Sequence, residues 1–584
     1  MLEPSRAAAT RARLLTVAPY LIAIVLALPS LQAPFFEDDV YHRAMLSLEE
    51  PGVHWSPLTL YEFVGDAAHP TTLLRDRGLV PWFAATDLRI RFFRPLSSAT
   101  LALDYYLFGE RAWAARLQSL AWFFAALWLT RGLLGRVLSA TAASWATLLY
   151  SLAAAHALPI SWIAARHGLV STVLGLVCVR IHLAWRQQDW PAGRWLGPLM
   201  FAAALTSGEM ALGTVGLLGA WELFARRDHL AVRVMALAPY AAIGAAYLVL
   251  YAAFGYGPRG GAYLSPADPA AAMAALRQFG TLIAELVAGI PSDVGTEAGA
   301  NAQWILAAIG VAAALIGVVL LRAIRTTMDP LDRLALVWLP VASAAAATPG
   351  AFAVLGGRVL TFALVPASGV LAIALLGTIA TVRDRARRPV ARIGFGAAAA
   401  ALILTHVAGA AAFRLLLASK LARIAAVQHE EAARVSGCTG TVLIVTASDP
   451  TIAMYVPATR HLEGLPPEST QVLSMSGSDQ RMENVTRTGF DIAVSGPPRP
   501  RTVWEVLFRA APMTAGTSVT VPSFTATVLE DRDGTPLRTR FEFGRPLDSD
   551  FCFVTWRDGH LTALPAPTPG TRLELPYEPG PMRQ

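Results

Sequence analysis

The chain has 584 residues, of which 54% are hydrophobic and only 15% are charged, and its mean hydropathy is +0.47. In soluble domains about a quarter of the residues are charged, so this composition excludes an ordinary soluble enzyme. At roughly 20 apolar residues for each membrane-spanning helix, the chain has room for about ten spans and a soluble domain. The predicted class is therefore a polytopic α-helical membrane protein.

The net charge of +7 comes from 48 basic and 41 acidic residues, and Lys420 is the only lysine. An excess of arginine suits short cytoplasmic loops, where basic residues set the topology. A nucleic-acid surface would instead show a basic stripe on one face or helix. We therefore predict no nucleic-acid partner.

The first apolar run covers residues 14–31, contains Pro19 and Pro29, and is not followed by a small-residue cleavage site. It is predicted to be an uncleaved helix and not a signal peptide. Arg6, Arg11 and Arg13 precede it, so the positive-inside rule places the N-terminus in the cytoplasm. The polar segment that follows the run would then be extracytoplasmic.

Ten further apolar runs bring the expected number of spans to about eleven. They cover residues 112–134, 140–160, 169–185, 195–206, 210–224, 234–254, 305–321, 334–347, 359–380 and 393–413. The runs 195–206 and 210–224 fit either two short spans or one kinked hairpin. Alternation of the spans puts the arginine clusters on one side: Arg131 and Arg136, Arg186 and Arg194, Arg226 and Arg227, Arg322 and Arg325, and Arg383, Arg385, Arg387 and Arg388.

An odd number of spans leaves the C-terminal region outside. We expect a transmembrane domain over residues 1–413, a linker helix over 414–435 and an extracytoplasmic mixed α/β or β-rich domain over 436–584. Within the first domain, residues 34–111 would form a long outer loop with an amphipathic run at 97–108. Strands are predicted at 441–445, 518–529, 539–543 and 551–556, with hairpin turns at Asp533-Gly534 and Asp558-Gly559.

The three cysteines are too few for a disulfide framework. Cys438 and Cys552 fall in the domain expected outside, where an oxidising environment permits pairing. They are a candidate disulfide, and free thiols remain the alternative. Cys178 lies in an apolar run and is expected to be a small apolar core residue.

Three acids stand together directly after the first apolar run: Glu37, Asp38 and Asp39. Adjacent carboxylates repel one another, so at least one should titrate unusually or find a cation or an arginine. A solvated acidic loop is the simpler interpretation. The functional interpretation is favoured by Arg94 in the same loop, because an arginine fork beside a bilayer can bind phosphate.

Further ionisable or polar residues stand at the ends of apolar runs: His156, Trp162, Arg166, Glu209 and Arg358. Such groups at membrane depth are costly and usually face a cavity or a partner, although helix-end snorkelling is the alternative for each one alone. In the expected topology they share the outer level with Asp38, Asp39 and Arg94. This convergence predicts a site for an anionic, lipid-attached substrate.

The order of these motifs resembles the GT-C membrane glycosyltransferases, and within them the O-mannosyltransferase-like branch that uses polyprenyl-phosphate sugars. The resemblance rests on the acids after the first span, on Arg94-Pro95-Leu96 followed by Phe108-Gly109, on His156 with Trp162 and Arg166, and on Ser207-Gly208-Glu209. It covers residues 14–224, is faint through 380 and does not extend to the C-terminal domain. Leu158 and Gly208 stand where the family has an acid and a lysine, and no tetratricopeptide repeats are found.

The resemblance implies an inverting transfer of a sugar to an extracytoplasmic acceptor, which is a protein, a lipid or a glycan. Asp38 or Asp39 would be the general base, and Arg94, Arg166 and Arg358 would hold the donor phosphate. Glu37, His156, Trp162 and Glu209 would line the substrate cavity. Some GT-C enzymes use a divalent metal, but no ligand set beyond Asp38 and Asp39 is evident in the sequence, so no cofactor is assigned.

The predicted partners are thus a polyprenyl-phosphate sugar donor, the bilayer and an unidentified acceptor, and the predicted location is a bacterial inner membrane. One alternative is a non-catalytic GT-C-like protein that acts in binding or assembly at the cell envelope. Another is a transporter, which should show internal repeats with broken spans in corresponding halves. No such pairing is found in the sequence.

Overall fold

The computed structural model describes residues 6–47, 55–261, 263–264, 268–435, 437–438, 440–464 and 469–583. The side chains of residues 6–15, Arg6, Arg11 and Arg13 among them, lie outside the described set. The chain divides into two compact units. The first, here the helical unit, comprises Met1–Gln32, Phe93–Phe254 and Leu264–Leu421. The second, here the sheet unit, comprises Ala33–Phe92, Gly255–Tyr263 and Ala422–Gln584.

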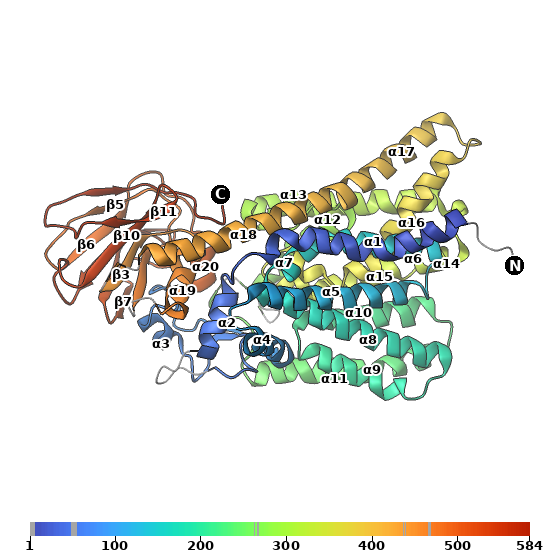
Figure 1. Ribbon diagram of the computed structural model, residues 1–584, viewed down its shortest axis with the longest axis horizontal. Helices are drawn as coiled ribbons and strands as arrows, with labels where there is room; N and C mark the ends of the chain where they lie inside the picture. Colours follow the sequence, from blue (N-terminus) through green and yellow to red (C-terminus); the bar gives the residue numbers. More distant parts are fainter. Residues whose placement is uncertain are drawn as a thin grey trace. The chain divides into compact units, whose positions relative to one another are not determined.

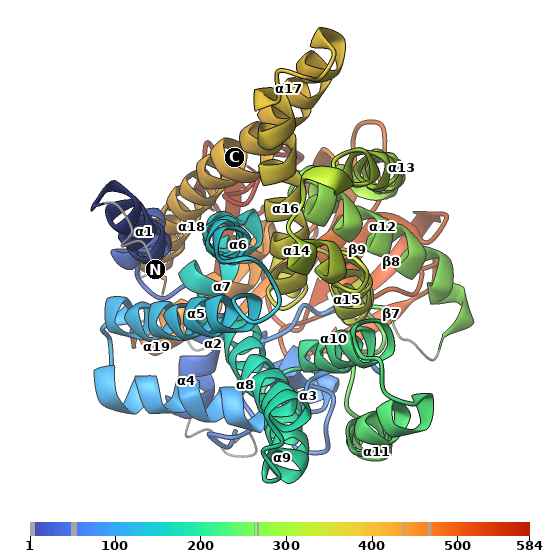
Figure 2. The same cartoon turned by 90° about the vertical axis from the view of Figure 1, so that its right-hand side faces the viewer.

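The long helices of the helical unit run alongside one another (Figures 1 and 2). Its helices are α1 (Arg6–Leu31), α4 (Pro95–Phe108), α5 (Ala112–Leu134), α6 (Ala140–Leu152), α7 (Ala157–Ser161), α8 (His167–Gln188), α9 (Gly193–Leu205), α10 (Gly213–Ala220), α11 (Leu230–Ala253), α12 (Ala272–Ala288), α13 (Asp293–Ala323), α14 (Pro330–Ala335), α15 (Leu339–Ala347), α16 (Leu364–Arg383), α17 (Pro389–Ile403) and α18 (Ala410–Arg434), of which the last turns belong to the sheet unit.

Among the described residues, six helices are long and apolar enough to cross a membrane, as expected of a polytopic helical membrane protein. They are Ala112–Leu134, Ile163–Gln188, Leu230–Ala253, Ala298–Ala323, Leu364–Arg383 and Pro389–Arg434, and Thr16–Leu31 is a shorter apolar helix. The expected count of about eleven spans is not confirmed.

Two predicted spans are divided in the structure. The run 140–160 becomes α6, a 3₁₀ turn and α7, because Ala153 leaves helical geometry at ψ 134°. The run 334–347 becomes α14 and α15, with the break at Trp338. The last predicted span and the predicted linker helix form instead one continuous helix from Pro389 to Arg434, in which the π-helical turn Leu404–Gly409 joins α17 to α18.

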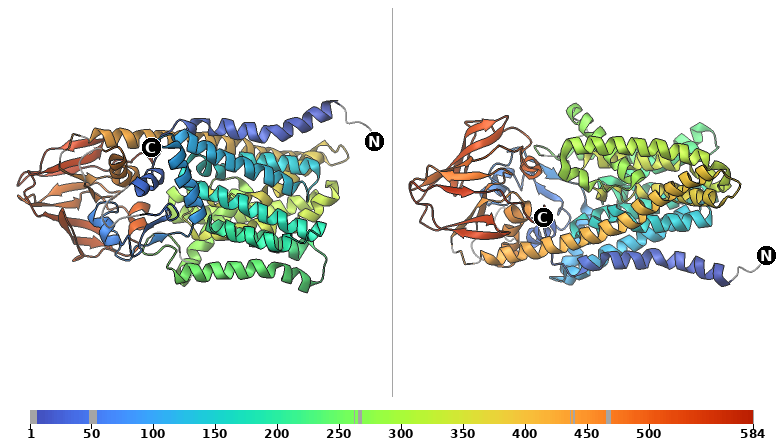
Figure 3. Two further views of the ribbon diagram at one scale, coloured as in Figure 1. Left: turned by 60° about the horizontal axis from the view of Figure 1, so that its bottom comes forward. Right: turned by 90° about the horizontal axis from the view of Figure 1, so that it is seen from above.

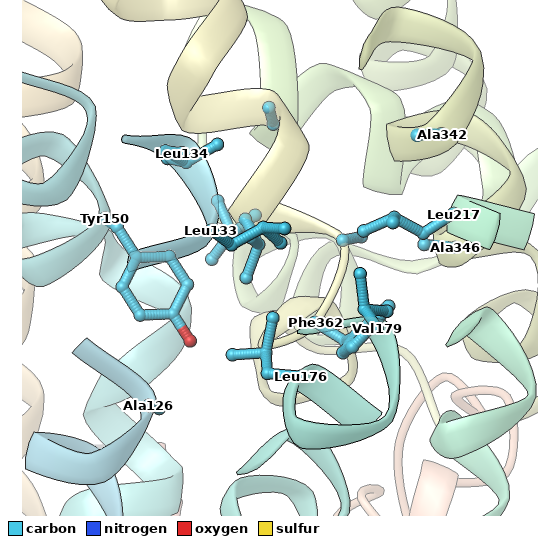
Figure 4. Close-up of a cluster of buried hydrophobic side chains, with 14 of the residues drawn as sticks. Ala126, Leu133, Leu134, Tyr150, Leu176, Val179, Leu217, Ala342, Ala346 and Phe362 are labelled. Carbon is cyan, nitrogen blue, oxygen red and sulfur yellow. The ribbon is translucent and has the colours of Figure 1, made fainter. Parts of the chain in front are cut away.

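The core of the helical unit is built from closely packed apolar side chains, among them Leu133, Leu176 and Val179 (Figure 4). Small residues allow two of its helices to approach closely: a Cβ added at Gly216 on α10 would lie 2.8 Å from the Cβ of Ala345 on α15. Such small-residue contacts are typical of helices packed in membranes. They fix the frame from which the polar residues below project.

The sheet unit combines residues that follow α1 with the C-terminal part of the chain. Its helices are α2 (Asp38–Ser47), α3 (Thr71–Asp76), α19 (Val456–Leu462) and α20 (Val503–Phe508). Its strands are β1 (Glu62–Val64), β2 (Ile90–Arg91), β3 (Thr441–Thr446), β4 (Thr470–Ser474), β5 (Gln480–Glu483), β6 (Gly489–Val494), β7 (Ser518–Val521), β8 (Phe524–Arg532), β9 (Thr535–Phe543), β10 (Phe551–Arg557), β11 (His560–Leu564) and β12 (Leu573–Leu575).

The strands form three sheets, of which the two larger ones are seen in Figure 3. The orders are β1-β2, β11-β10-β3-β4 and β12-β5-β6-β9-β8-β7. In the four-stranded sheet β3 runs parallel to both β10 and β4, whereas the six-stranded sheet is antiparallel throughout. Buried phenylalanines on strands of both larger sheets pack against one another, among them Phe490 on β6, Phe541 on β9 and Phe553 on β10.

Both predicted hairpins are confirmed. Asp533 and Gly534 have φ values of 51° and 75°, and Asp558 and Gly559 have 54° and 74°, so both central residues are left-handed, as tight β-hairpins prefer. The predicted strands at 441–445, 539–543 and 551–556 are also confirmed. The run 518–529 proved to be two strands, β7 and β8, which pair with each other across a tight turn.

Candidate functional site

The acids that follow α1 form a sharp turn in the sheet unit, here the acid turn (Glu37, Asp38 and Asp39). Glu37 adopts a left-handed conformation at φ 49°, and its carbonyl accepts the backbone N–H groups of Val40 and Tyr41 at 2.9 and 3.2 Å. Helix α2 therefore begins at Asp38, and both aspartates lie in its first turn. The positive end of a helix dipole stabilises negative charge at this position.

The three acids have different surroundings. Asp38 is half-buried and accepts a hydrogen bond from the Tyr455 hydroxyl at 2.6 Å, whereas Asp39 is fully buried. Burial raises the pKa of Glu37 well above its usual range, and Asp38, Asp449 and Asp39 raise it further. The protonated form of Glu37 is thus favoured, whereas the neighbouring Asp38 stands at the positive end of the helix and accepts the Tyr455 hydrogen bond.

Asp449 completes the acidic surroundings of Glu37. Its carboxylate accepts the backbone N–H groups of Thr451 at 2.9 Å and Met582 at 2.7 Å. Burial raises the pKa of Asp449, and these two backbone donors oppose the rise. Burial thus raises the pKa of two neighbouring acids, Glu37 and Asp449, in the same direction.

In the helical unit, the structure brings Arg94 and Glu209 together. Nε and Nη2 of Arg94 donate to one carboxylate oxygen of Glu209 at 2.9 and 2.7 Å, and the Tyr251 hydroxyl donates to the other at 2.5 Å. Oγ of Ser97 donates to the Ser207 carbonyl at 2.7 Å, which fixes the start of α4 against the turn that carries Glu209. The predicted phosphate ligand Arg94 is thus already neutralised by a carboxylate.

Arg166 is fully enclosed, with no exposed side-chain surface. It forms an ion pair with the buried Asp104 at 2.5 Å, and it donates to Ser119 Oγ at 2.9 Å, to the Ala115 carbonyl at 2.6 Å and to the Gln118 side chain. Burial raises the pKa of Asp104 to about 6, although Arg166 opposes the rise. These contacts make Arg166 an anchor between helices and leave it little to offer a ligand.

His156 lies in the short 3₁₀ turn between α6 and α7 and has no exposed surface. Its ring packs against Phe123 and Tyr150, with centroids 4.7 and 4.5 Å away, while Trp162 is half-buried at the end of α7. The buried Arg414 donates to the Ser151 carbonyl and lies over the Phe123 ring at 5.7 Å. Arg414 was not among the residues predicted from the sequence, although an arginine directly after an apolar run indicates a candidate buried charge.

Arg358 is half-buried, and its Nη2 donates to the Val354 carbonyl at 3.3 Å. A Cβ added at the neighbouring Gly356 would lie 3.0 Å from Arg358 Nη1 and 3.1 Å from Asp293 Oδ1. In the described part of the chain, no carboxylate comes within ion-pairing distance of Arg358. Of the three predicted phosphate arginines, it is the one that no carboxylate holds.

Glu285 and Asp293 were also missed. Glu285 Oε2 accepts the Ser292 backbone N–H at 2.8 Å and the Ser292 hydroxyl at 2.6 Å. The other oxygen faces Gly357, where a Cβ would lie 2.7 Å away, and Asp293 Oδ2 accepts the Gly357 N–H at 2.9 Å. Burial raises the pKa of Glu285 to about 8, with Asp293 adding to the rise. A buried carboxylic acid thus lies under the loop that carries Arg358, and the single acid late in an apolar helix was its signal.

The candidate disulfide partners lie close together in the sheet unit. Burial and a contact with the Cys552 thiol raise the pKa of Cys438 to about 12. Both are free thiols in this structure. Within the described residues, no group of three or more His, Cys, Asp or Glu side chains is placed to hold a metal ion.

No protein-family model matches the chain, and no curated protein matches it. Among solved structures, it is similar to the crystal structure of ArnT from Cupriavidus metallidurans bound to undecaprenyl phosphate, at 15% identity and a TM-score of 0.38. The likeness covers 78% of this chain and 89% of that chain. A similarity this distant supports no conclusion about activity, which has to come from the chain's own side chains.

Proposed function

We propose that the protein is a GT-C-type glycosyltransferase that transfers a sugar from a polyprenyl-phosphate donor to an acceptor outside the cytoplasm, with Asp38 as the general base. The observation that carries the proposal is the Asp38 carboxylate. It is half-buried, stands at the start of a helix directly after an apolar helix, and is held by the Tyr455 hydroxyl at 2.6 Å. A base needs this combination of access, fixed direction and ionised form.

In this mechanism Asp38 takes the proton from the acceptor hydroxyl while the acceptor oxygen attacks the anomeric carbon. The bond from that carbon to the donor phosphate breaks, and the polyprenyl phosphate leaves with the bonding electrons. Arg358 is our candidate for stabilising this charge, because it is half-buried and Arg94 and Arg166 are held by carboxylates. Asp39 is fully buried and is the less suitable base.

The same pairing of the two arginines supports a second candidate function. A non-catalytic relative that acts in binding or assembly would keep Arg94–Glu209 and Arg166–Asp104 as structural ion pairs. It would need neither an ionised Asp38 nor a phosphate-binding Arg358. Activity distinguishes the two candidates.

The test uses membranes that contain the wild type, Asp38→Asn or Asp39→Asn at equal protein levels, supplied with polyprenyl-phosphate sugars radiolabelled in the sugar. We expect Asp38→Asn to reduce transfer by about 10²- to 10⁴-fold, as removal of a general base does, and Asp39→Asn to reduce it less. Transfer that survives in Asp38→Asn would remove Asp38 as the base. If the wild type consumes no donor with any sugar in the panel, the non-catalytic function is favoured.

A further inference from the structure

Four hydrogen bonds in the sheet unit, here the ring, link Glu37 to Asp38 by way of the C-terminal part of the chain, and covalent bonds within Tyr455 and between Glu37 and Asp38 close it. The backbone N–H of Glu37 donates to Gln428 Oε1 at 2.9 Å, and Gln428 Nε2 donates to Thr459 Oγ1 at 2.8 Å. The Thr459 hydroxyl donates to the Tyr455 carbonyl at 2.8 Å. The Tyr455 hydroxyl then donates to Asp38 Oδ1 at 2.6 Å.

The ring is held by buried side chains. Gln428 and Thr459 have almost no exposed surface, so their hydrogen bonds do not compete with water. The aromatic side chain of Tyr455 packs edge-on against that of Tyr41 on α2, with a centroid distance of 6.3 Å. The Tyr41 hydroxyl donates to the Leu79 carbonyl at 2.5 Å. The packing on Tyr41 and the hydrogen bond to Asp38 therefore orient the Tyr455 hydroxyl toward Asp38.

A tyrosine hydroxyl donates to a carboxylate more strongly when the carboxylate is ionised. The bond at 2.6 Å therefore favours the charged form of Asp38 over the protonated form and fixes the orientation of its carboxylate relative to Tyr455. Burial and the neighbouring acids Asp38 and Glu37 raise the pKa of Tyr455 well above its usual range, so the hydroxyl keeps its proton and remains a donor.

We propose that Tyr455 is the positioning residue of Asp38, and that the chain's C-terminal region thereby controls the direction and protonation of the base. This inference rests on the proposed function for its catalytic consequence, and it adds a role for a region that the family resemblance does not reach. The titratable groups near Asp38 are Glu37, Asp39, Tyr41 and Tyr455, of which Tyr455 donates a hydrogen bond to it, and Asp449 acts on Glu37.

The first test measures transfer against pH for the full chain with Tyr455→Phe. We expect kcat to fall about tenfold with little change in donor KM, and the acidic limb of the profile to move up by about one pH unit, because the ionised base loses its donor. Tyr41→Phe is the matched control: it removes a buried hydroxyl of the same cluster that bonds to Leu79 and not to Asp38. Equal profiles for Tyr455→Phe and Tyr41→Phe would overturn the inference and leave the proposed function intact.

Thr459→Val gives the same test without changing the tyrosine, because it removes the Thr459 hydroxyl that joins Gln428 to the Tyr455 carbonyl. We expect a smaller shift of the acidic limb in the same direction. If Thr459→Val folds and its profile coincides with that of the wild type while Tyr455→Phe fails to fold, the ring does not position the base and the inference fails.

A second measurement does not depend on transfer. Thermal unfolding of the purified full chain is followed against pH for the wild type, Asp38→Asn, Tyr455→Phe and the double variant. We expect the Tyr455→Phe effect to depend on pH in the wild-type background and to lose this dependence with Asp38→Asn. If Tyr455→Phe and Asp38→Asn are coupled in this way in a protein that transfers no sugar, the inference is supported although the proposed function fails. If the effects of the two substitutions on thermal unfolding are additive at every pH, the inference is overturned.

Discussion

Arg94 and Arg166 of the helical unit are each paired with a carboxylate, whereas the acid turn of the sheet unit gathers acidic side chains. Arg166 and Asp104 are both buried and lie 2.5 Å apart. At Glu37, by contrast, Asp38 and Asp449 both act in the same direction and raise its pKa. Opposite charges that meet inside a protein satisfy each other and fix the packing, while like charges force one group to keep a proton.

The difference separates two kinds of polar residue that look alike in the sequence. An arginine whose fork is already filled by a carboxylate contributes to packing and has little left for a substrate phosphate. A carboxylate turn in which one member is neutral can exchange a proton. In the proposed function Arg166 has a structural role and Asp38 a chemical one, and the following predictions test this division.

The largest stability effect is expected at the buried ion pair. Asp104→Leu leaves the Arg166 charge buried without its carboxylate, and breaking such a pair typically costs about 3–5 kcal/mol. Arg166→Met leaves the Asp104 carboxylate buried without its arginine, and we expect a similar loss in the free energy of unfolding. Thermal or denaturant unfolding of the purified protein measures both effects.

The control is the double variant Asp104→Leu with Arg166→Met, which replaces the pair by apolar groups. Because apolar replacement of a buried pair is often close to neutral, we expect the double variant to recover most of the lost stability and to retain sugar transfer. Loss of transfer in a stable double variant would return Arg166 to the substrate site.

The next effect concerns the sheet unit: the proposed function places it outside the cytoplasm, and from this we predict that Cys438 and Cys552 form a disulfide. The two thiols are in contact, and a native disulfide contributes about 2–4 kcal/mol. Protein purified without reductant should lack two hydrogen atoms by intact mass, and Cys438→Ser should unfold more easily. Cys178→Ser is the control, because Cys178 lies in the helical unit; alkylation of all three thiols before reduction would rule the disulfide out.

A smaller effect is expected at Glu209. Glu209→Gln keeps the shape of the side chain but removes the charge that Arg94 binds, and both side chains retain some exposure, so we expect a loss of about 1–2 kcal/mol in the free energy of unfolding. Glu110→Gln, at an exposed position, should change little. A large drop in transfer without a change in stability would show that Glu209 acts on the substrate and is more than a partner for Arg94.

Much of the local structure follows from sequence patterns that short segments decide by themselves. The Asp-Gly pairs specify tight hairpins because both residues tolerate left-handed geometry, and Pro95 begins α4 because proline suits the first turn of a helix. The pairing of Arg94 with Glu209, 115 positions apart, could not be read in this way. Whether an arginine is paired with a carboxylate depends on how helices distant in sequence pack together, and local sequence spacing does not predict this packing.

The acid turn shows the same limit. The sequence indicated that one of the adjacent acids would titrate unusually, and burial makes Glu37 that acid. It did not reveal Gln428 or Tyr455, because their contacts with residues 37 and 38 join positions 391 and 417 apart in the sequence. Glu285 was missed because helix α12 was not predicted, although an acid in an otherwise apolar stretch is costly unless it is neutral or paired.

That acid provides a further test of the division, since Glu285 is a buried carboxyl with no arginine bound to it by an ion pair in the described structure. Its pKa is about 8 in the folded protein and near the ordinary 4.5 when unfolded. Between these values the folded state binds the extra proton, so stability should fall as pH rises from about 5 to 8, by up to about 1.4 kcal/mol for each pH unit. Glu285→Gln, which imitates the protonated acid, should remove this part of the pH dependence and leave the protein more stable at pH 8 than the wild type. Unfolding curves at several pH values measure this, with Glu110→Gln as the exposed control; a wild-type slope that persists unchanged in Glu285→Gln would mean that Glu285 is ionised in the fold and that the loop carrying Arg358 rests on a charged neighbour.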